Sequence, residues 1–218
     1  MKKYIIILLS FAPLFIQAQY GSEKAQNQLK SLAQTLQSAK NIRIQFTLAQ
    51  NTEKASSSKS DAEKTVLSQP KQGILWISEN KFRLMLDGQI IINNGKTLYT
   101  YLPQANEIQI NDASASENEL NPLTLLKTYQ QNYRSKYIRE ENGYLIVDLL
   151  PLNENRFYKI RLEISTSSNS PRSISLYDRN GNTTTYQIDK FELNKDVDPS
   201  IFTFNPDDYK NAEVVDLR

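Results

Sequence analysis

The stretch that decides the fold is Gln72 to Leu102, QGILWISENKFRLMLDGQIIINNGKTLYTYL. Apolar and aromatic residues run through it in short groups, and polar residues separate these groups at 78–80, 87–88 and 93–95. Gly and Asn adopt positive φ at low cost, and Asn and Asp side chains cap their own backbone, so the breaks are typical of tight turns. The stretch therefore predicts three or four short strands in an antiparallel meander.

Two of these strands are apolar on both faces, at residues 74–77 (ILWI) and 90–92 (III). A half-buried strand alternates apolar and polar residues, whereas a strand that is apolar on both faces needs cover on both sides. We expect a core or a lid to cover one face, and the other to offer a surface for an apolar ligand. This pattern favours a binding protein over an enzyme.

The composition removes the commonest catalytic groups, because none of the 218 residues is histidine or cysteine. Without them there is no imidazole base, no thiolate, no serine–histidine triad and no ordinary zinc site. A carboxylate hydrolase using Asp178 and Glu163 is the remaining enzymatic hypothesis, although isolated acids on strand faces are usually solvated charges. We therefore expect no catalytic residue, no metal and no cofactor.

The N-terminus predicts a secretion signal over residues 1–18. Lys2-Lys3 form a basic start, Tyr4 to Phe15 an apolar stretch, and Ile16-Gln17-Ala18 a cleavage site before Gln19. A retained membrane helix is the weaker alternative, because a span needs about 20 apolar residues. We expect residues 19–218 to form one exported domain.

The net charge and the lack of cysteine limit where the protein is located and which partners it binds. Removing Lys2 and Lys3 from 26 basic residues leaves 24, equal to the 24 acidic ones, so nothing favours nucleic acid or an anionic membrane. The absence of cysteine excludes both disulfides and a lipid on an N-terminal cysteine. The periplasm of a Gram-negative cell fits best, with the extracellular space as the alternative, and we expect a monomer.

Two amphipathic helices are predicted. The first covers Ser22 to Lys40 and carries a single apolar stripe, which either covers one end of the core or forms a lid over a cavity. The second begins at Asn121-Pro122, an N-cap followed by proline at the first helical position. Its leucines, at 123, 125 and 126, either dip into a concave face or plug the core.

The rest of the chain reads as strands and loops. Residues 42–48 alternate apolar and polar side chains, 51–69 read as a long solvated hairpin loop, and the chain from Tyr133 onward predicts further hairpins and a last short strand near 201–204. About ten or eleven strands follow one another without helical crossovers, which requires an antiparallel sheet that usually curls. The expected fold is mainly β.

The order of these parts resembles the LolA-type periplasmic lipoprotein carriers over essentially the whole mature chain. Six fragments carry the resemblance: Phe46 to Gln50 after the first helix, Gly73 to Ile77 with Lys81-Phe82-Arg83, Asn94 to Tyr101, Asn121-Pro122-Leu123, Tyr177 to Thr183, and Phe202 to Pro206 with Val214-Val215-Asp216.

The resemblance implies an unclosed antiparallel half-barrel with a helical lid over its concave apolar face. Such proteins take lipoprotein acyl chains from an inner-membrane ABC exporter and pass them to an outer-membrane acceptor. A sensor domain that binds lipoprotein or lipid on the same scaffold and signals to a membrane protein is the alternative function. Many members carry Arg-Pro after the tryptophan strand, where this chain has Glu79-Asn80, and the segment Asn51 to Gln69 is a second departure.

Eight apolar residues are the candidate acyl-chain contacts, although alternation alone does not tell which face of each strand is concave, and each of them could equally be core. They are Phe46, Trp76, Phe82, Leu84, Leu98, Tyr101, Leu123 and Leu126.

Overall fold

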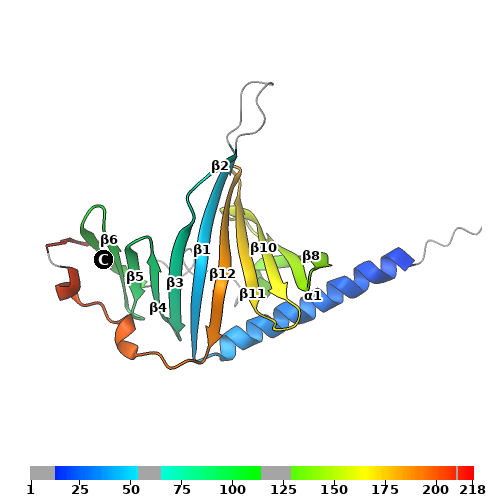
Figure 1. The fold of residues 1–218 in the computed structure, drawn as a ribbon, viewed down its shortest axis with the longest axis horizontal. Coiled ribbons are helices and arrows are strands. Elements are labelled where there is room, and N and C mark those ends of the chain that lie inside the picture. Colours follow the sequence, from blue (N-terminus) through cyan, green and yellow to red (C-terminus); the bar gives the residue numbers. More distant parts are fainter. Residues whose placement is uncertain (1–12, 54–64, 114–128, 210) are drawn as a thin grey trace, which may run out of the picture.

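The computed structural model describes residues 13–53, 65–113, 129–209 and 211–218. Within them lie one long helix, a single helical turn at 129–132, thirteen strands and the two short 3-10 helices η2 and η3 (Figure 1). In chain order these are α1 Pro13–Ser38, β1 Asn41–Glu53, β2 Thr65–Leu67, β3 Lys71–Ser78, β4 Lys81–Leu86, β5 Gln89–Asn93, β6 Thr97–Leu102, β7 Glu107–Asp112, β8 Tyr133–Glu141, β9 Tyr144–Pro151, β10 Phe157–Ser165, β11 Pro171–Asp178, β12 Asn182–Leu193, η2 Pro199–Phe202, η3 Pro206–Tyr209 and β13 Glu213–Asp216.

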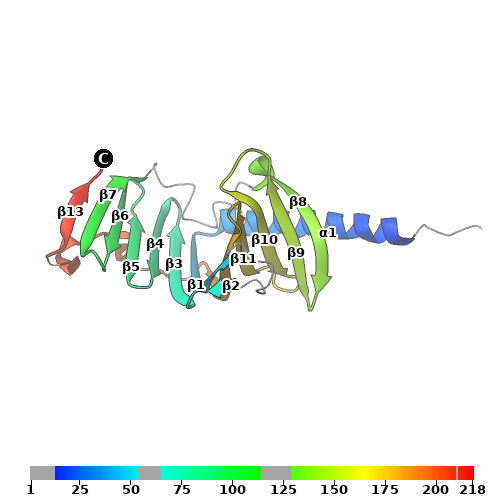
Figure 2. The same cartoon turned by 90° about the horizontal axis from the view of Figure 1, so that it is seen from above.

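All the described strands belong to one sheet, in the order β13-β7-β6-β5-β4-β3-β1-β12-β11-β10-β9-β8, with β2 paired to β1. Only β13 and β7 pair in parallel; the other described pairs are antiparallel. The end strands, β13 and β8, lie at opposite ends of the sheet (Figure 2). The prediction of an unclosed, mainly β sheet is confirmed.

The strand at the centre, β1, joins the two halves of the sheet because it pairs with β3 on one side and β12 on the other. A register shift between Gln45 and Phe46 interrupts the β1–β12 ladder, and such irregularities bend a strand. The sheet thus presents two walls, β3–β7 and β8–β12, which turn toward each other around the concave side (Figure 2).

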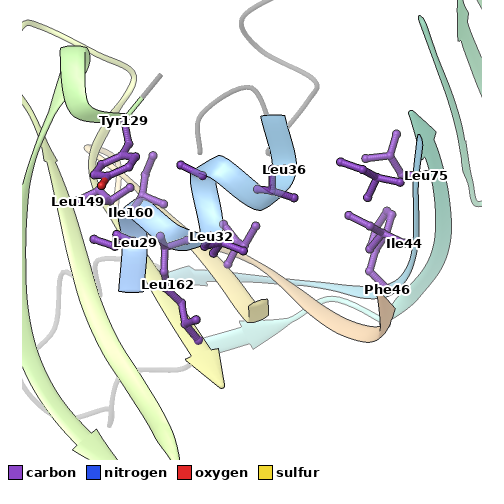
Figure 3. Packing of buried hydrophobic residues seen from close by; sticks show 14 of the residues in the cluster. Leu29, Leu32, Leu36, Ile44, Phe46, Leu75, Tyr129, Leu149, Ile160 and Leu162 are labelled. Atoms are coloured by element: carbon purple, nitrogen blue, oxygen red, sulfur yellow. The ribbon is translucent and has the colours of Figure 1, made fainter. Parts of the chain in front are cut away.

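The long helix, α1, packs on the β8–β12 wall. The apolar stripe expected from the sequence is buried, with Leu32 and Leu36 fully inaccessible. Leu29 lies beside Leu149, Ile160 and Leu162 (Figure 3). The helix covers part of the concave face with core residues, and it begins at Pro13, nine residues before the predicted start at Ser22.

The C-terminal segment covers the opposite, convex face of the β3–β7 wall. Phe204 stacks on Tyr99 with ring centroids 4.4 Å apart, and Arg83 Nη1 donates a hydrogen bond to the Ile201 carbonyl at 3.1 Å. On the strand between Arg83 and Tyr99, Ile92 is only 1% exposed. The chain's own tail therefore covers the part of the second apolar face around Ile92.

Three local expectations were wrong. The predicted strand near 201–204 is replaced by η2, because Asp198 accepts a hydrogen bond from the Ser200 amide and Pro199 has no N–H for a ladder. The segment 51–69 is not all loop, since β1 extends to Glu53 and β2 pairs with it. With β13 as well, the sheet has more strands than the ten or eleven expected.

The second predicted helix lies mostly outside the described residues, including Leu123 and Leu126. Its last turn, at 129–132, is helical. There Tyr129 is buried beside Leu149 and Ile160 (Figure 3), so this turn belongs to the core.

Replacing Leu32 with alanine should lower the free energy of unfolding by about 2–5 kcal/mol, because it opens a cavity between α1 and the β8–β12 wall. Urea denaturation measures the change. The exposed neighbour Gln34→Ala is the control and should shift stability by less than about 0.5 kcal/mol. Equal effects of the two substitutions would contradict the packing of this helix.

Candidate functional site

The candidate site is an apolar cavity of about 140 Å³ on the concave side of the sheet, between the two walls. Its lining residues come from β1, β3, β4 and β5 on one side and from β11 and β12 on the other. They are Ile44, Phe46, Leu75, Leu84, Leu86, Gln89, Ile91, Pro171, Ile174, Tyr186 and Ile188. The lining contains no charged residue, so the cavity suits a hydrocarbon group.

Strand register brings four of these side chains into one row. Ile44 lies opposite Leu75, Leu75 opposite Leu84, and Leu84 opposite Ile91. Directly paired residues point to the same face of a sheet, so the row crosses four neighbouring strands at one level. Ile44 and Leu75 are seen on the wall facing α1 in Figure 3. The row is the apolar floor of the cavity.

Phe46 forms one edge of this floor and is held by a glycine. It lies opposite Gly73 in the β1–β3 ladder, and a Cβ on Gly73 would come within 2.7 Å of Phe46 Cε2. The ring also contacts Tyr186, with centroids 5.4 Å apart and planes tilted by 59°. Only a glycine at 73 leaves the ring in this position, which is a known way of pairing glycine and aromatic residues across strands.

The polar atoms of the lining stay uncharged near neutral pH. Burial raises the pKa of the Tyr186 phenol above its ordinary value, partly offset by the positive charge of Arg156. The other side chain with hydrogen-bonding capacity in the lining is the Gln89 amide, which is neutral. The cavity thus offers an electrically neutral surface to its ligand.

The structure separates the eight sequence-based candidates into four groups. Phe46 and Leu84 line the cavity. Phe82 and Leu98 are buried core residues on the same face of the sheet but do not line it.

Trp76 and Tyr101 lie on the convex face. The Arg43 guanidinium lies over the Trp76 ring at 5.9 Å from its centroid, and Tyr101 packs on Tyr209 with centroids 4.6 Å apart. Both residues are therefore outside the cavity. Leu123 and Leu126 belong to the undescribed part of the chain.

Sequence reasoning missed most of the lining, including Ile44, Leu75 and Ile91. The sequence pattern did contain a signal for them. Ile44 lies two residues before the candidate Phe46, and Leu75 and Ile91 each pair with the candidate Leu84. Ile174, Tyr186 and Ile188 carry no such local signal, because β11 and β12 are far from β1 to β5 in the chain. Ile188 does pair with Phe46, but this contact joins β12 to β1 and has no signal in the local sequence pattern.

The two carboxylates of the hydrolase hypothesis have other roles. Asp178 accepts hydrogen bonds from the Asn182 side chain and from the amides of Asn180 and Asn182, which lowers the pKa of this carboxyl and closes the β11–β12 turn. Glu163 Oε2 lies 3.9 Å from Arg172 Nε. In the β10–β11 ladder Glu163 is opposite Ser173, whereas Asp178 is opposite Phe157, at the other end of the two strands. They do not form a catalytic pair, and the described residues contain no cluster of acidic ligands able to hold a metal.

Within the same described ranges, no helix has the length and apolar character needed to cross a membrane.

Comparisons with solved structures find similar chains at low sequence identity. An uncharacterized conserved protein from Thermus thermophilus is 14% identical, with a TM-score of 0.53 over 88% of this chain and 98% of that chain. A LolA superfamily protein from Nitrosomonas europaea is 13% identical, with a TM-score of 0.41 over 83% and 97% of the two chains.

A putative outer membrane lipoprotein-sorting protein domain from Vibrio parahaemolyticus is also 13% identical, with a TM-score of 0.43 over 89% and 100%. No curated protein matches the chain. The family model of the outer membrane lipoprotein carrier protein LolA matches residues 54–205, which is more than half of the sequence. This chain therefore belongs to the LolA family of outer membrane lipoprotein carrier proteins.

Proposed function

We propose that this protein is a periplasmic carrier that binds the acyl chains of lipoproteins, or of a related lipid, in the cavity between its two walls. It takes them from an inner-membrane ABC exporter and delivers them to an outer-membrane acceptor. The observation that carries the proposal is the uncharged apolar row on the concave face, formed by a chain of the LolA family. Binding and release of hydrocarbon need no catalytic group, so we propose no enzymatic activity.

The cavity sets a condition on binding. Its 140 Å³ is smaller than the roughly 300–1,000 Å³ of pockets that enclose whole ligands. Side chains in the lining must therefore move, or the acyl chain must extend beyond the cavity. Leu84, Leu86 and Ile188 are only half-buried, which makes them the side chains that can move with the least loss of packing.

An acyl chain that the cavity buries only in part can be both bound and released. Each buried methylene contributes about 0.8 kcal/mol, so enclosing only part of the chain limits the affinity and helps delivery to an acceptor. If the two walls move apart at the acceptor, the open state holds the acyl chain more weakly than the closed state and releases it. The size of this effect equals the difference in the ligand's affinity for the two states.

The N-terminal helix is compatible with removal of a signal at Ala18. The first part of α1 extends past the end of the sheet (Figures 1 and 2), whereas the buried stripe begins at Ala25. Cleavage after Ala18 would leave the stripe in place and an exported domain of residues 19–218. A sensor on the same scaffold remains the alternative: rescue of a carrier-depleted cell favours transport, and co-purification with a transmembrane signalling protein favours sensing.

The Leu84→Gln variant should bind an apolar naphthalene dye at least about fivefold more weakly than the wild type. The bound dye would bury the new amide against the apolar lining without a hydrogen-bond partner, which costs about 1–3 kcal/mol. Fluorescence titration measures the affinity. Met85→Gln is the matched control, because Met85 is the adjacent residue on the opposite face and is 37% exposed. Equal loss in both variants, with both folded by circular dichroism, would contradict the site.

The Gly73→Ala variant should push the Phe46 ring away from β3 and into the cavity, lowering dye affinity and costing about 1–3 kcal/mol of stability. Combining it with Phe46→Leu should recover part of both losses, because the smaller side chain leaves room for the methyl group. Fluorescence titration and chemical denaturation of the two single variants and the double variant measure the coupling. Additive effects would mean that the contact does not shape the cavity.

A further inference from the structure

A second hollow, of about 340 Å³, adjoins the apolar cavity on the concave side of the sheet. Leu86 and Gln89 line both spaces. The residues that line this hollow, which we name the vestibule, are Lys71, Leu86, Asp87, Gln89, Leu102, Pro103, Gln104 and Ala105. Their position at the β4–β5 and β6–β7 turns places the vestibule at the end of the strands that carry the apolar row.

The vestibule differs from the cavity in its chemistry. It contains one cation and one anion, Lys71 and Asp87, and their Nζ and Oδ2 atoms form an ion pair at 2.6 Å. Gln89 and Gln104 add amides that both donate and accept hydrogen bonds. The described lining therefore carries no net charge but many hydrogen-bonding groups.

The apolar cavity and the polar vestibule adjoin each other, and this arrangement matches a molecule with an apolar tail and a polar head. The hydrocarbon end suits the row from Ile44 to Ile91, and the polar linkage at its head suits the vestibule. A negatively charged head would gain from Lys71 but be repelled by Asp87, which already holds that cation. An uncharged ester or amide gives up less hydration and can use both glutamine amides.

We infer that the vestibule binds the uncharged ester or amide linkage of an acyl amphiphile, and that the Lys71–Asp87 pair selects against free fatty acids and other anionic heads. This inference rests on the proposed function, because it concerns the head of the molecule whose tail occupies the cavity. Both partners are about half exposed, so the selection is expected to be a few-fold in affinity and no more.

The test is displacement of the bound naphthalene dye at about pH 8, where a fatty-acid carboxylate is ionised. Three probes share one tail: monolauroylglycerol as the neutral ester, N-lauroylglycinamide as the neutral amide, and laurate as the anion. With the wild-type protein, the two neutral probes should displace the dye at lower concentration than laurate. The ester and amide arms also distinguish a glyceride from an acylated peptide as the source of the linkage.

The Asp87→Asn variant should strengthen laurate binding by about two- to fivefold and so narrow the preference for the neutral probes, because it frees the Lys71 charge. Asn suits the backbone at this position, where φ is 53°. The Lys71→Met variant should weaken laurate further. Glu141→Gln, which removes one partner of the surface ion pair with Arg139, is the control and should change none of the three.

Stronger binding of laurate than of the neutral probes by the wild type overturns the inference, as does an Asp87→Asn variant with unchanged laurate affinity. In either case dye binding itself still supports the proposed function. If the wild type binds neither dye nor any probe, the proposed function fails and this inference fails with it.

Discussion

The apolar stripe of α1, in the part of the helix from residue 23 to residue 38, packs into the core of the β8–β12 wall. Leu29, Leu32 and Leu36 in this stripe are buried almost completely. Between the walls, the described residues leave the apolar cavity, with its row from Ile44 to Ile91. Within the described residues, α1 covers only part of the concave apolar surface, and the candidate site is the part that it leaves open.

The tail of the chain packs on only one face of the β3–β7 wall, the convex one. Phe202 is buried, and Phe204 stacks on Tyr99, so the convex face is packed by η2 and the residues after it. The apolar character of Ile90 to Ile92 on both faces thus has two causes. Ile92 is core beneath the tail, whereas Ile91 belongs to the cavity. Only the concave side of this wall is left for the proposed ligand.

On the convex face of the other wall, two cationic side chains have close partners. Arg161 donates two hydrogen bonds to the buried Asp148 across β9 and β10, and this contact raises the pKa of the guanidinium. Lys159 lies over the Tyr177 ring at 3.7 Å from its centroid. These contacts give the charged groups partners within the sheet. The apolar cavity lies on the opposite, concave side.

Much of the fold could be predicted from the sequence because its signals are local. Turn residues at 79–80 and 87–88 predicted the hairpins, and these turns do contain the positive φ angles of Glu79, Asp87 and Gly88. The apolar stripe predicted α1. The strand near 201–204 could not be excluded in the same way, because aromatic residues in a capped 3-10 segment have the same composition as a strand.

The site was less predictable, because alternation identifies two faces without telling which is concave. Leu75 and Trp76 are equally apolar neighbours on one strand, yet only Leu75 lines the cavity. The choice depends on where α1 and the tail pack, and those contacts join residues far apart in the chain. The same holds for the contribution of β11 and β12 through Ile174 and Ile188.

The most direct test of the account is photo-crosslinking with a diazirine-bearing acyl probe, followed by residue-level peptide mapping. The account predicts crosslinks on the concave face, at Leu84, Leu86, Ile91 and Ile188. Crosslinks concentrated on Ile74, Met85 or the C-terminal tail would place the acyl chain on the convex face and contradict it.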